Sequence, residues 1–307
     1  MIQAQPFLKW AGGKTQHIKK FQKFYPAELK SGKIKRYFEP FLGSGAVFFD
    51  VAQKYKIDSA LLCDINEELI LTYLVIQRDV DKLFEYLLRY KKSYLKLDTE
   101  KQKEFYYELR TNYNLQRFNI DYKKYSENWI PRAAQLIFMN KTCYNGLFRM
   151  NSKGEFNSPV GRYKNPKIFD AENLQKISEL LQMAEVCKLH FADIKSKARK
   201  SSFVYFDPPY RPLNRTASFT SYSTFQFSDP QQIELANLFK ALDRRQAKLM
   251  LSNSDPKNED PSDNFFDELY EDYHLYRIKA NRMINSKKDK RGKINEILVL
   301  NYDVEAA

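Results

Sequence analysis

The sequence predicts an α/β protein built on a doubly wound, mostly parallel sheet. Three observations support this fold class: short apolar segments end abruptly at polar or glycine-rich turns, helical patterns alternate with them, and the chain supplies a large core. Of its 307 residues 43% are hydrophobic, with 23 Phe and 21 Tyr. That is enough apolar material for one large core or two modest ones.

Five segments have the composition of strands, and helical patterns lie between them. The strand candidates are Arg36–Glu39, Ser59–Cys63, Ser202–Phe206, Ala247–Leu251 and Glu296–Tyr302. The first four are compact apolar runs, which are typical of strands covered by helices on both faces. The helical patterns run from Gly45 to about Tyr55, from Asn66 to Ile76 and from Pro230 to Ala241.

The middle of the chain has a different character. Val80 to Leu109 is helical, charged and rich in Tyr, and Pro131–Met139 is a second helical run. Asn140 to Lys164 then turns to Asn, Gly, Lys and aromatic residues, and within it Arg149–Phe156 has the pattern of a β-hairpin that turns at Ser152-Lys153-Gly154. We interpret 77–170 as a helical and β-hairpin domain inserted between two parts, 1–76 and 171–307, of one α/β domain.

The charge balance and the cysteines narrow the class of protein. The formal net charge of +13 favours a polyanionic partner, although a basic solvated surface explains it about as well. Cys63, Cys143 and Cys187 form neither a CxxC pair nor a zinc spacing, so we expect a reduced, cytoplasmic setting and no metal site. The first residues contain no apolar signal segment, and no run of 18 apolar residues occurs, so secretion and membrane insertion are not expected.

The tetrapeptide Asp207-Pro208-Pro209-Tyr210 follows an apolar strand, at the end of the sheet where open α/β proteins bind ligands. Its prolines fix two φ angles and remove two backbone donors, which leaves a rigid turn rich in acceptors. The Asp207 carboxylate and the Pro208 carbonyl suit the two N–H groups of a planar amine, and Tyr210 suits its ring. The alternative is a proline-rich surface turn without function.

Two further motifs end strands. Phe38-Glu-Pro-Phe-Leu-Gly-Ser-Gly45 has glycines that allow close backbone approach before a helix, but such a turn is also common without a ligand. A nicotinamide-binding turn normally has a third small residue, whereas Phe48 stands there. Asp64, about 20 residues further on, suits the hydroxyls of a ribose. It also suits the N-cap of the following helix.

The opening segment Phe7-Leu-Lys-Trp-Ala-Gly-Gly-Lys14 contains the third candidate. Gly12 and Gly13 would let the backbone and the Lys14 cation approach an anionic group such as a carboxylate. The alternatives are a plain core role for Trp10 and a plain surface role for Lys14.

These segments together give a specific resemblance. FLKWAGGK, FEPFLGSGAVFF, CDIN and FDPPY occur in the order of the Dam family of DNA adenine-N6 methyltransferases. The likeness continues through NKTCYNGLFRMNSKGEFNSPVGRYKNPK, TASFTSY, LMLSNS and RGKINEILVLNY, so it covers nearly the whole chain. The order is similar to that of the group whose target-recognition region lies between the glycine-rich and DPPY motifs.

The resemblance implies a site for S-adenosylmethionine. Trp10, Lys14, Asp64 and Asp207 would line it, with Gly43 and Gly45 near the amino-acid end of the cofactor. In the segment His190-Phe-Ala-Asp193, Phe191 would stack on the cofactor's adenine and Asp193 would accept a hydrogen bond from its amine. The residues themselves leave open a cap role for Asp193.

The resemblance also implies contacts with double-stranded DNA. The residues that would make them are Lys9, Tyr144, Asn145, Leu147, Arg149, Pro159, Arg162 and Tyr163. Arg149 would bond a guanine edge, Leu147 and Pro159 would touch a thymine methyl group, and Tyr144 would enter the base stack as the adenine leaves it. Without the resemblance, a polar hairpin with no partner explains this segment slightly better.

The expected function is therefore methyl transfer to N6 of a flipped adenine, in GATC because the hairpin residues resemble the GATC readers of the family. Asn140-Lys141-Thr142 departs from a subgroup that has Asn-Arg-Tyr there, which puts flanking contacts in doubt. A cognate restriction endonuclease acting on the same site is a possible partner. The alternatives are methylation of RNA or of a side-chain amide, a catalytically silent DNA-binding regulator, against which the intact DPPY turn argues, and a dinucleotide oxidoreductase.

Overall fold

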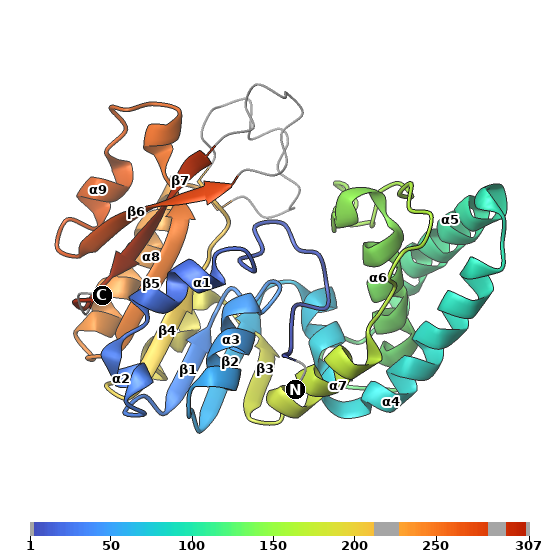
Figure 1. Ribbon diagram of the computed structural model, residues 1–307, viewed down its shortest axis with the longest axis horizontal. Coiled ribbons are helices and arrows are strands. Elements are labelled where there is room, and N and C mark those ends of the chain that lie inside the picture. The colour runs from blue at the N-terminus through green and yellow to red at the C-terminus, as the bar shows by residue number, and fades with distance from the viewer. Residues whose placement is uncertain (1–2, 212–226, 282–292, 305–307) are drawn as a thin grey trace.

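The central feature of the computed structural model, which describes residues 3–211, 227–281 and 293–304, is a twisted sheet (Figure 1). Within these residues the sheet has seven strands in the order β3-β2-β1-β4-β5-β7-β6. The strands are β1 Arg36–Glu39, β2 Ser59–Asp64, β3 Ala184–Lys188, β4 Ser202–Phe206, β5 Lys248–Ser254, β6 His274–Asn281 and β7 Lys293–Leu300. Strands β1 to β5 pair in parallel, and β7 runs antiparallel to both β5 and β6. The predicted mostly parallel α/β sheet is confirmed.

Helices cover both faces of the sheet (Figure 1). They are α1 Ile18–Phe21, α2 Ala27–Lys30, α3 Ala46–Lys54, α4 Glu67–Leu95, α5 Thr99–Gln116, α6 Trp129–Thr142, α7 Ala171–Leu181, α8 Asp229–Asp243 and α9 Phe265–Leu269. Short 3₁₀ segments include η2 Arg117–Asn119, η3 Tyr144–Gly146 and η4 Phe191–Ser196. One core joins α1, α3, α4 and α7 to one sheet face, and a second joins α8, α9 and η4 to the other.

The alternation of side chains along each strand explains the two cores. On β4, Phe203 and Tyr205 are buried in the first core, and Val204 and Phe206 are buried in the second. A strand whose successive side chains point to opposite faces must be apolar at every position when both faces are covered. The apolar runs of the sequence therefore predicted β1 and β4 to the residue, and β2, β5 and β7 to within a few residues.

Strands β3 and β6 have no counterpart in the sequence interpretation. Each lies at an edge of the sheet. In β3 only Val186 is buried, and β6 carries His274, Arg277 and Lys279 among its apolar residues. Edge strands often carry charged side chains, so they lack the apolar run that identifies a central strand.

The middle of the chain forms a helical lobe beside the sheet, with its own core between α4, α5 and α6 (Figure 1). The helical pattern over Val80–Leu109 comprises two helices, because α4 ends at Leu95 and Asp98 caps α5 by accepting from the Lys101 N–H. The boundary proposed between residues 76 and 77 falls inside α4, close to Asp79, whose φ of −137° and ψ of 43° interrupt the helix.

The predicted hairpin is present in the lobe. Met150 and Phe156 form an antiparallel bridge, and the Gly154 N–H donates to the Asn151 carbonyl at 2.9 Å to close the turn. The TASFTSY motif lies outside the described residues, and so do residues 287–292, most of the basic run KKDKRGK that the sequence indicates as a loop.

The three cysteines are free thiols, and Cys63 and Cys187 lie opposite each other on β2 and β3 with their Sγ atoms 3.5 Å apart. Among the described residues, no three His, Cys, Asp or Glu side chains gather in a way that would hold a metal ion. In the same part of the chain, no helix combines the length and apolar character that crossing a membrane requires.

Candidate active site

A cleft of about 1180 Å³ lies at the carboxyl ends of the parallel strands, between the sheet and the helical lobe. Glu39 and Pro40 enter it from the end of β1, Asp64 from the end of β2, and Asp207 and Pro208 from the end of β4. This is the edge at which open α/β sheets bind ligands. The cleft brings together the opening segment, the glycine-rich turn and the Asp207–Tyr210 turn.

Asp207 has two side-chain partners at the edge of the cleft. Its Oδ1 accepts from the Lys14 ammonium at 2.7 Å and from the Ser252 hydroxyl at 3.0 Å. Burial raises the pKa of Asp207, while the Lys14 charge and the hydrogen bonds from Lys14 and Ser252 oppose that rise. The carboxylate is therefore held in one orientation.

Lys14 is buried, in contrast to the surface role that the sequence left open. Its ammonium also donates to the Gly12 carbonyl at 2.8 Å and lies 4.7 Å from the centre of the Tyr210 ring. Burial by itself lowers the pKa of Lys14, but Asp207, Tyr210 and Glu296 together outweigh it, so the pKa is raised and the cation persists.

The glycine-rich turn depends on two left-handed residues. Gly43 has φ of 46° and Gly45 has φ of 67°, and α3 begins at the next residue, Ala46. A Cβ atom on Gly45 would lie 2.7 Å from the Tyr73 hydroxyl. Glycine is therefore required there for both conformation and space.

Asp64 connects this turn to the second strand. Its Oδ2 accepts from the Gly43 N–H at 3.1 Å and its Oδ1 from the Asn66 N–H at 3.0 Å. The N-cap of α4 is Asn66, whose side chain accepts from the N–H groups of Glu68 and Leu69, so the alternative cap role for Asp64 is wrong.

The opening segment bridges the sheet and the lobe. Trp10 lines the cleft and stacks on Phe148 of the lobe, with ring centres 5.3 Å apart. Asn140 accepts from the Lys9 N–H and donates to the Lys9 carbonyl, both at 2.8 Å, and also donates to the Gly146 carbonyl at 3.0 Å. Asn140 therefore fixes the opening segment against the end of α6.

The two cofactor-binding candidates that follow β3 differ in their position relative to the cleft. Phe191 lines the cleft and stacks on Phe41 at 5.3 Å. Asp193 is exposed on η4 and is not among the residues that line the cleft.

The DNA-contact candidates, apart from Lys9, lie on one segment of the lobe between residues 144 and 163. Tyr144 is 54% exposed, and Asn145 has φ of 58°. Arg149 donates through Nε to Asn157 at 2.8 Å, which leaves its terminal nitrogens without a partner among the described residues. Lys9 joins the segment by donating to the Tyr163 hydroxyl at 3.2 Å. The remaining candidates, Leu147, Pro159 and Arg162, are half-buried or exposed on the same segment.

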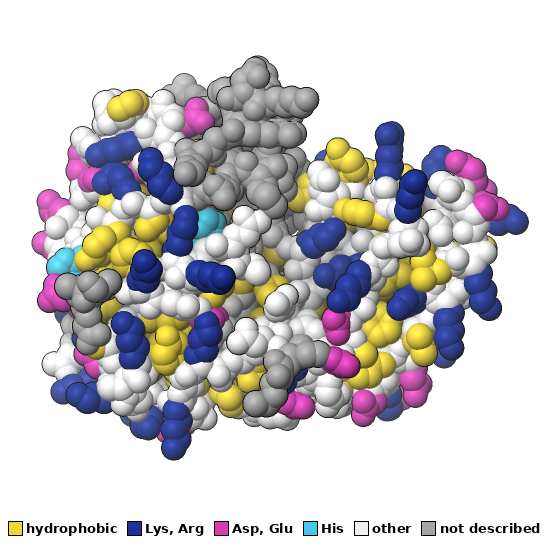
Figure 2. Space-filling view, viewed as in Figure 1, with side chains coloured by type: hydrophobic (Ala, Val, Ile, Leu, Met, Phe, Trp, Pro, Cys, Tyr) yellow, Lys and Arg dark blue, Asp and Glu magenta, His cyan; other side chains and the backbone are white. Residues whose placement is uncertain are grey.

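Figure 2 shows Lys and Arg side chains spread over one face of both the sheet part and the lobe. The positive charge that composition indicates is therefore not confined to one half of the molecule. A surface of this kind suits a polyanion that contacts both halves.

Several residues of the cleft were missed from the sequence. Glu39 is 2% exposed, and its Oε2 accepts from the Tyr37 hydroxyl at 2.7 Å and the Phe48 N–H at 3.0 Å. Burial raises the pKa of Glu39 to about 8. Its position as the last residue of an apolar strand, like that of Asp64, was the available signal. No comparable sequence signal marked the lobe residues that line the cleft. These residues are Arg117, Phe118, Tyr122, Phe148 and Met150.

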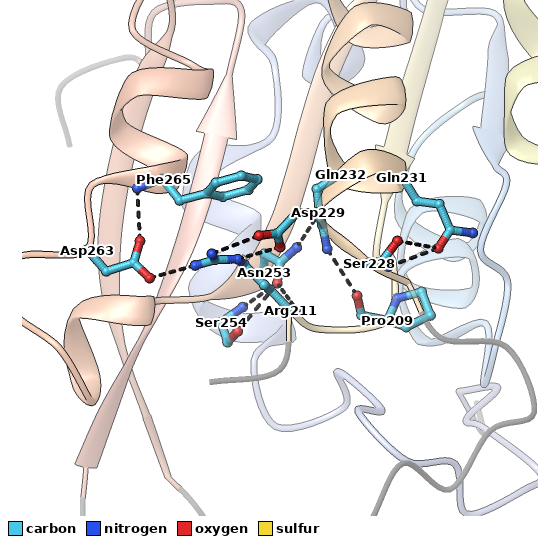
Figure 3. Close-up of polar contacts among 10 residues, drawn as sticks. All are labelled: Pro209, Arg211, Ser228, Asp229, Gln231, Gln232, Asn253, Ser254, Asp263 and Phe265. Atoms are coloured by element: carbon cyan, nitrogen blue, oxygen red, sulfur yellow. Dashed lines mark hydrogen bonds and ion pairs between the residues drawn. The ribbon is translucent and has the colours of Figure 1, made fainter. Parts of the chain in front are cut away.

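The residue that follows the Asp207–Tyr210 turn is anchored by ion pairs (Figure 3). This residue, Arg211, forms ion pairs with Asp229 at the start of α8 at 2.7 Å and with Asp263 before α9 at 2.6 Å. Its guanidinium also lies 4.2 Å from the centre of the Phe265 ring. The end of the turn is therefore fixed to the start of α8 and to the segment before α9.

Known proteins give the chemistry that such a site performs. The family model for D12 class N6 adenine-specific DNA methyltransferases matches residues 10–284. The Type II methyltransferase M.MjaIII of Methanocaldococcus jannaschii is 50% identical over 302 residues, which cover 98% of this chain and all of that protein. M1.LlaDCHI of Lactococcus lactis subsp. cremoris, another Type II methyltransferase, is 39% identical over 98% of this chain and 96% of its own length. The DNA adenine methylase of Escherichia coli (strain K12) is 33% identical, also over 98% and 96%. The chain belongs to the D12 class of N6 adenine-specific DNA methyltransferases.

Proposed function

We propose that the chain transfers a methyl group from S-adenosylmethionine to N6 of an adenine that has left the duplex, within the sequence GATC. The observation that carries the proposal is a pair of open acceptors in the cleft. Asp207 Oδ1 is paired, but among the described residues neither Asp207 Oδ2 nor the Pro208 carbonyl accepts a hydrogen bond, and both residues line the cleft beside Tyr210.

The two acceptors match the two N–H groups of the exocyclic amine of adenine, and the Tyr210 ring matches the flat face of the base. Each N–H of the amine would donate to one acceptor, which leaves the nitrogen lone pair directed at the methyl donor, and Tyr210 would stack on the base. A base inside a duplex is inaccessible to such a site, so the adenine must be extruded. The cleft of about 1180 Å³ has room for a nucleobase and a cofactor together.

The sheet side of the cleft fits S-adenosylmethionine, which supplies a methyl group on a positively charged sulfur. We assign the ribose hydroxyls to Asp64, the amino-acid end to Gly43, Gly45 and Lys14, and apolar contacts to Trp10 and Phe191. The half-buried Asp64 carboxylate, which lines the cleft, and the left-handed glycines, which let the backbone approach a ligand, support this assignment. Asp193 would reach the adenine amine of the cofactor only by turning toward the cleft.

The lobe would read the DNA sequence, with 77–170 as the target-recognition domain. Lys9, Tyr144, Asn145, Leu147, Arg149, Pro159, Arg162 and Tyr163 are the proposed contacts. The exposure of Tyr144 and the open terminal nitrogens of Arg149 support these roles. The net charge of +13 favours duplex DNA as the partner.

Incubation with radiolabelled S-adenosylmethionine and two matched duplexes, with and without GATC, tests the proposal. We expect label at N6 of adenine in the GATC duplex alone. Equal labelling of both duplexes would refute the sequence specificity, and labelling of an RNA competitor in preference to DNA would refute the substrate.

We also propose that a restriction endonuclease cutting GATC accompanies the enzyme, because two of its relatives are named Type II methyltransferases. Host DNA should then resist an endonuclease that is blocked by methylated GATC. Sensitive host DNA would contradict this role.

A further inference from the structure

The Asp207–Tyr210 turn cannot be held in place by the usual backbone hydrogen bonds, because Pro208 and Pro209 have no N–H groups. A turn that must present two acceptors in a fixed direction therefore needs support from side chains. That support comes from neighbouring residues on β5, Ser252 and Asn253, and from Gln232 on α8. All three side chains are 0% exposed.

Ser252 holds the first residue of the turn. The register of β4 and β5 pairs Phe206 with Leu251, so the next residues, Asp207 and Ser252, lie level with each other. The Ser252 hydroxyl donates to Asp207 Oδ1 at 3.0 Å and lies 2.8 Å from the Tyr205 hydroxyl. Because Ser252 has one proton, Tyr205 must donate to Ser252, and burial raises the pKa of Tyr205 so that it keeps its proton.

Asn253 and Gln232 hold the far end of the turn (Figure 3). The Gln232 amide donates to the Pro209 carbonyl at 3.4 Å and accepts from the Asn253 amide at 3.2 Å. Asn253 Oδ1 in turn accepts from the Arg211 N–H at 3.4 Å and from the Ser254 N–H at 2.8 Å. The two buried amides therefore tie the turn to both α8 and β5.

The alternation of β5 explains how adjacent residues support opposite ends. Met250 lies in the core on one face of the sheet and Leu251 in the core on the other. Ser252 continues the face of Met250, toward Tyr205, and Asn253 continues the face of Leu251, toward α8. The end of β5 therefore supports the turn from both faces of the sheet.

We propose that Ser252, Gln232 and, through Gln232, Asn253 are positioning residues. Ser252 and Gln232 occupy Asp207 Oδ1 and the Pro209 carbonyl, and so leave Asp207 Oδ2 and the Pro208 carbonyl, which accept no hydrogen bond from the described residues, open to the target amine. The proposal rests on the proposed function, because it assigns the open pair to that amine. The three residues touch neither substrate nor cofactor in this scheme and act through the turn.

Ser252→Ala removes the hydroxyl at little cost in volume. We expect kcat to fall about 10- to 100-fold, as for a misplacement of about 1 Å, with the Kd for S-adenosylmethionine and DNA within about two-fold of the wild type. Ser252→Thr keeps the hydroxyl and should recover most of the activity. Ser178→Ala, which removes a buried hydroxyl on α7, is the matched control and should leave kcat unchanged.

The pH profile separates positioning from a general loss of structure. A hydrogen bond to the ionised form lowers the pKa of a carboxyl, so losing Ser252 should move the acidic limb of the kcat/KM profile to higher pH. Ser178→Ala should not move it. The other ionisable groups that face Asp207 are Lys14, Glu39, Tyr205, Tyr210 and Glu296.

Gln232→Leu tests the other end of the turn and should also lower kcat about ten-fold or more without weakening cofactor binding. Its control is Gln77→Leu on α4, which removes hydrogen bonds to the Leu181 and Ala184 carbonyls and should lower only the Tm. If Ser252→Ala does not fold, Tyr205→Phe removes the donor that orients the Ser252 hydroxyl, and a smaller fall in kcat is expected because Ser252 can still donate to Asp207; an unchanged kcat would contradict the positioning role of Ser252.

The outcomes distinguish the two proposals. A wild-type enzyme that methylates no adenine refutes the proposed function. An active wild type whose Ser252→Ala and Gln232→Leu variants match their controls in kcat and in pH profile refutes the positioning role alone.

Discussion

The sheet side of the cleft and the DNA-contact segment of the lobe hold their polar groups in opposite ways. On the sheet wall of the cleft, Lys14 and Glu39 are buried and each has a named partner, and Ser252 is buried behind that wall, where it donates to Asp207. On the segment between residues 144 and 163, Tyr144 is exposed and Arg149 keeps unpaired terminal nitrogens among the described residues. The sheet wall is fixed before any ligand arrives, and the DNA-contact segment leaves its groups available.

The difference follows from what each region is proposed to do. Methyl transfer requires acceptors in one place, and burial with full pairing removes alternative orientations. Reading a base sequence requires donors and apolar groups that meet a partner from outside, so these groups must stay open until the DNA binds. The sheet supplies the first condition and the hairpin segment the second.

The largest effect should come from the sheet wall. Asp207→Asn replaces an acceptor with an amide that has only one carbonyl oxygen and loses the ion pair with Lys14. We expect methyl transfer to fall by about 10³-fold or more in a radiolabel assay. Asp58→Asn, at the opposite end of β2, is the control and should keep full activity. An Asp207→Asn variant within ten-fold of the wild type would contradict the assignment of the turn.

The second largest effect should be a loss of stability when the buried ion pair between α6 and α4 is removed. Arg132 on α6 donates through Nε to Glu68 on α4 at 2.8 Å and through Nη1 to the Tyr113 carbonyl at 2.9 Å, and its side chain is 1% exposed. Arg132→Met leaves a buried carboxylate unpaired and should cost about 3–5 kcal/mol in urea unfolding. The exposed pair of Lys176 and Glu179 gives the control, since Lys176→Met should cost about 1 kcal/mol or less. Equal losses in the two variants would show that the buried pair has no special role.

The DNA-contact segment should give a smaller effect that depends on sequence. Arg149→Ala should raise the activation free energy reported by kcat/KM on GATC by about 1–3 kcal/mol and relax discrimination at the guanine, as measured with duplexes that carry 7-deazaguanine there, which lacks the N7 acceptor. Arg149→Lys should recover little, because lysine cannot make the bidentate contact. Arg89→Ala, an exposed arginine on α4, should change neither value. A uniform loss on all duplexes would instead assign Arg149 to the phosphates.

The smallest effect should be on the pH dependence of stability. Burial raises the pKa of Glu39 from an ordinary value of 4.5 to about 8, so the folded state binds the proton more tightly than the unfolded state. That contribution favours folding at low pH and is lost as the pH rises from about 4.5 to about 8. Glu39→Gln keeps an acceptor for Tyr37 and Phe48 and should flatten the fall in Tm between about pH 5 and 8. A parallel fall in both proteins would show that Glu39 is not responsible.

The sequence predicted most of the elements that form the sheet wall. Central strands are apolar at every position because both faces are covered, and this local pattern identified β1 and β4. The edge strands β3 and β6 were not predicted, because strands at a sheet edge tolerate charged side chains and so lack a continuous apolar run. The hairpin was equally visible, since its turn residues determine it locally.

What the sequence determined by itself was therefore local: the rigid turn at 207–210, the glycines at 43 and 45, and the carboxylate that follows β2. The resemblance then connected these motifs to a chemistry that local physics does not specify. The contacts within the DNA-reading segment and at the cofactor's adenine stay predictions.

Only the tertiary structure decided which partners these groups take. The pairing of Lys14 with Asp207, the support of Asp207 by Ser252, and the junction that Asn140 makes with Lys9 all join segments far apart in the chain. Such contacts depend on the order of strands in the sheet and on which face each residue reaches, and neither is encoded in a short stretch of sequence. A local motif supplies the acceptors, but the packing of distant elements selects which of them remain open.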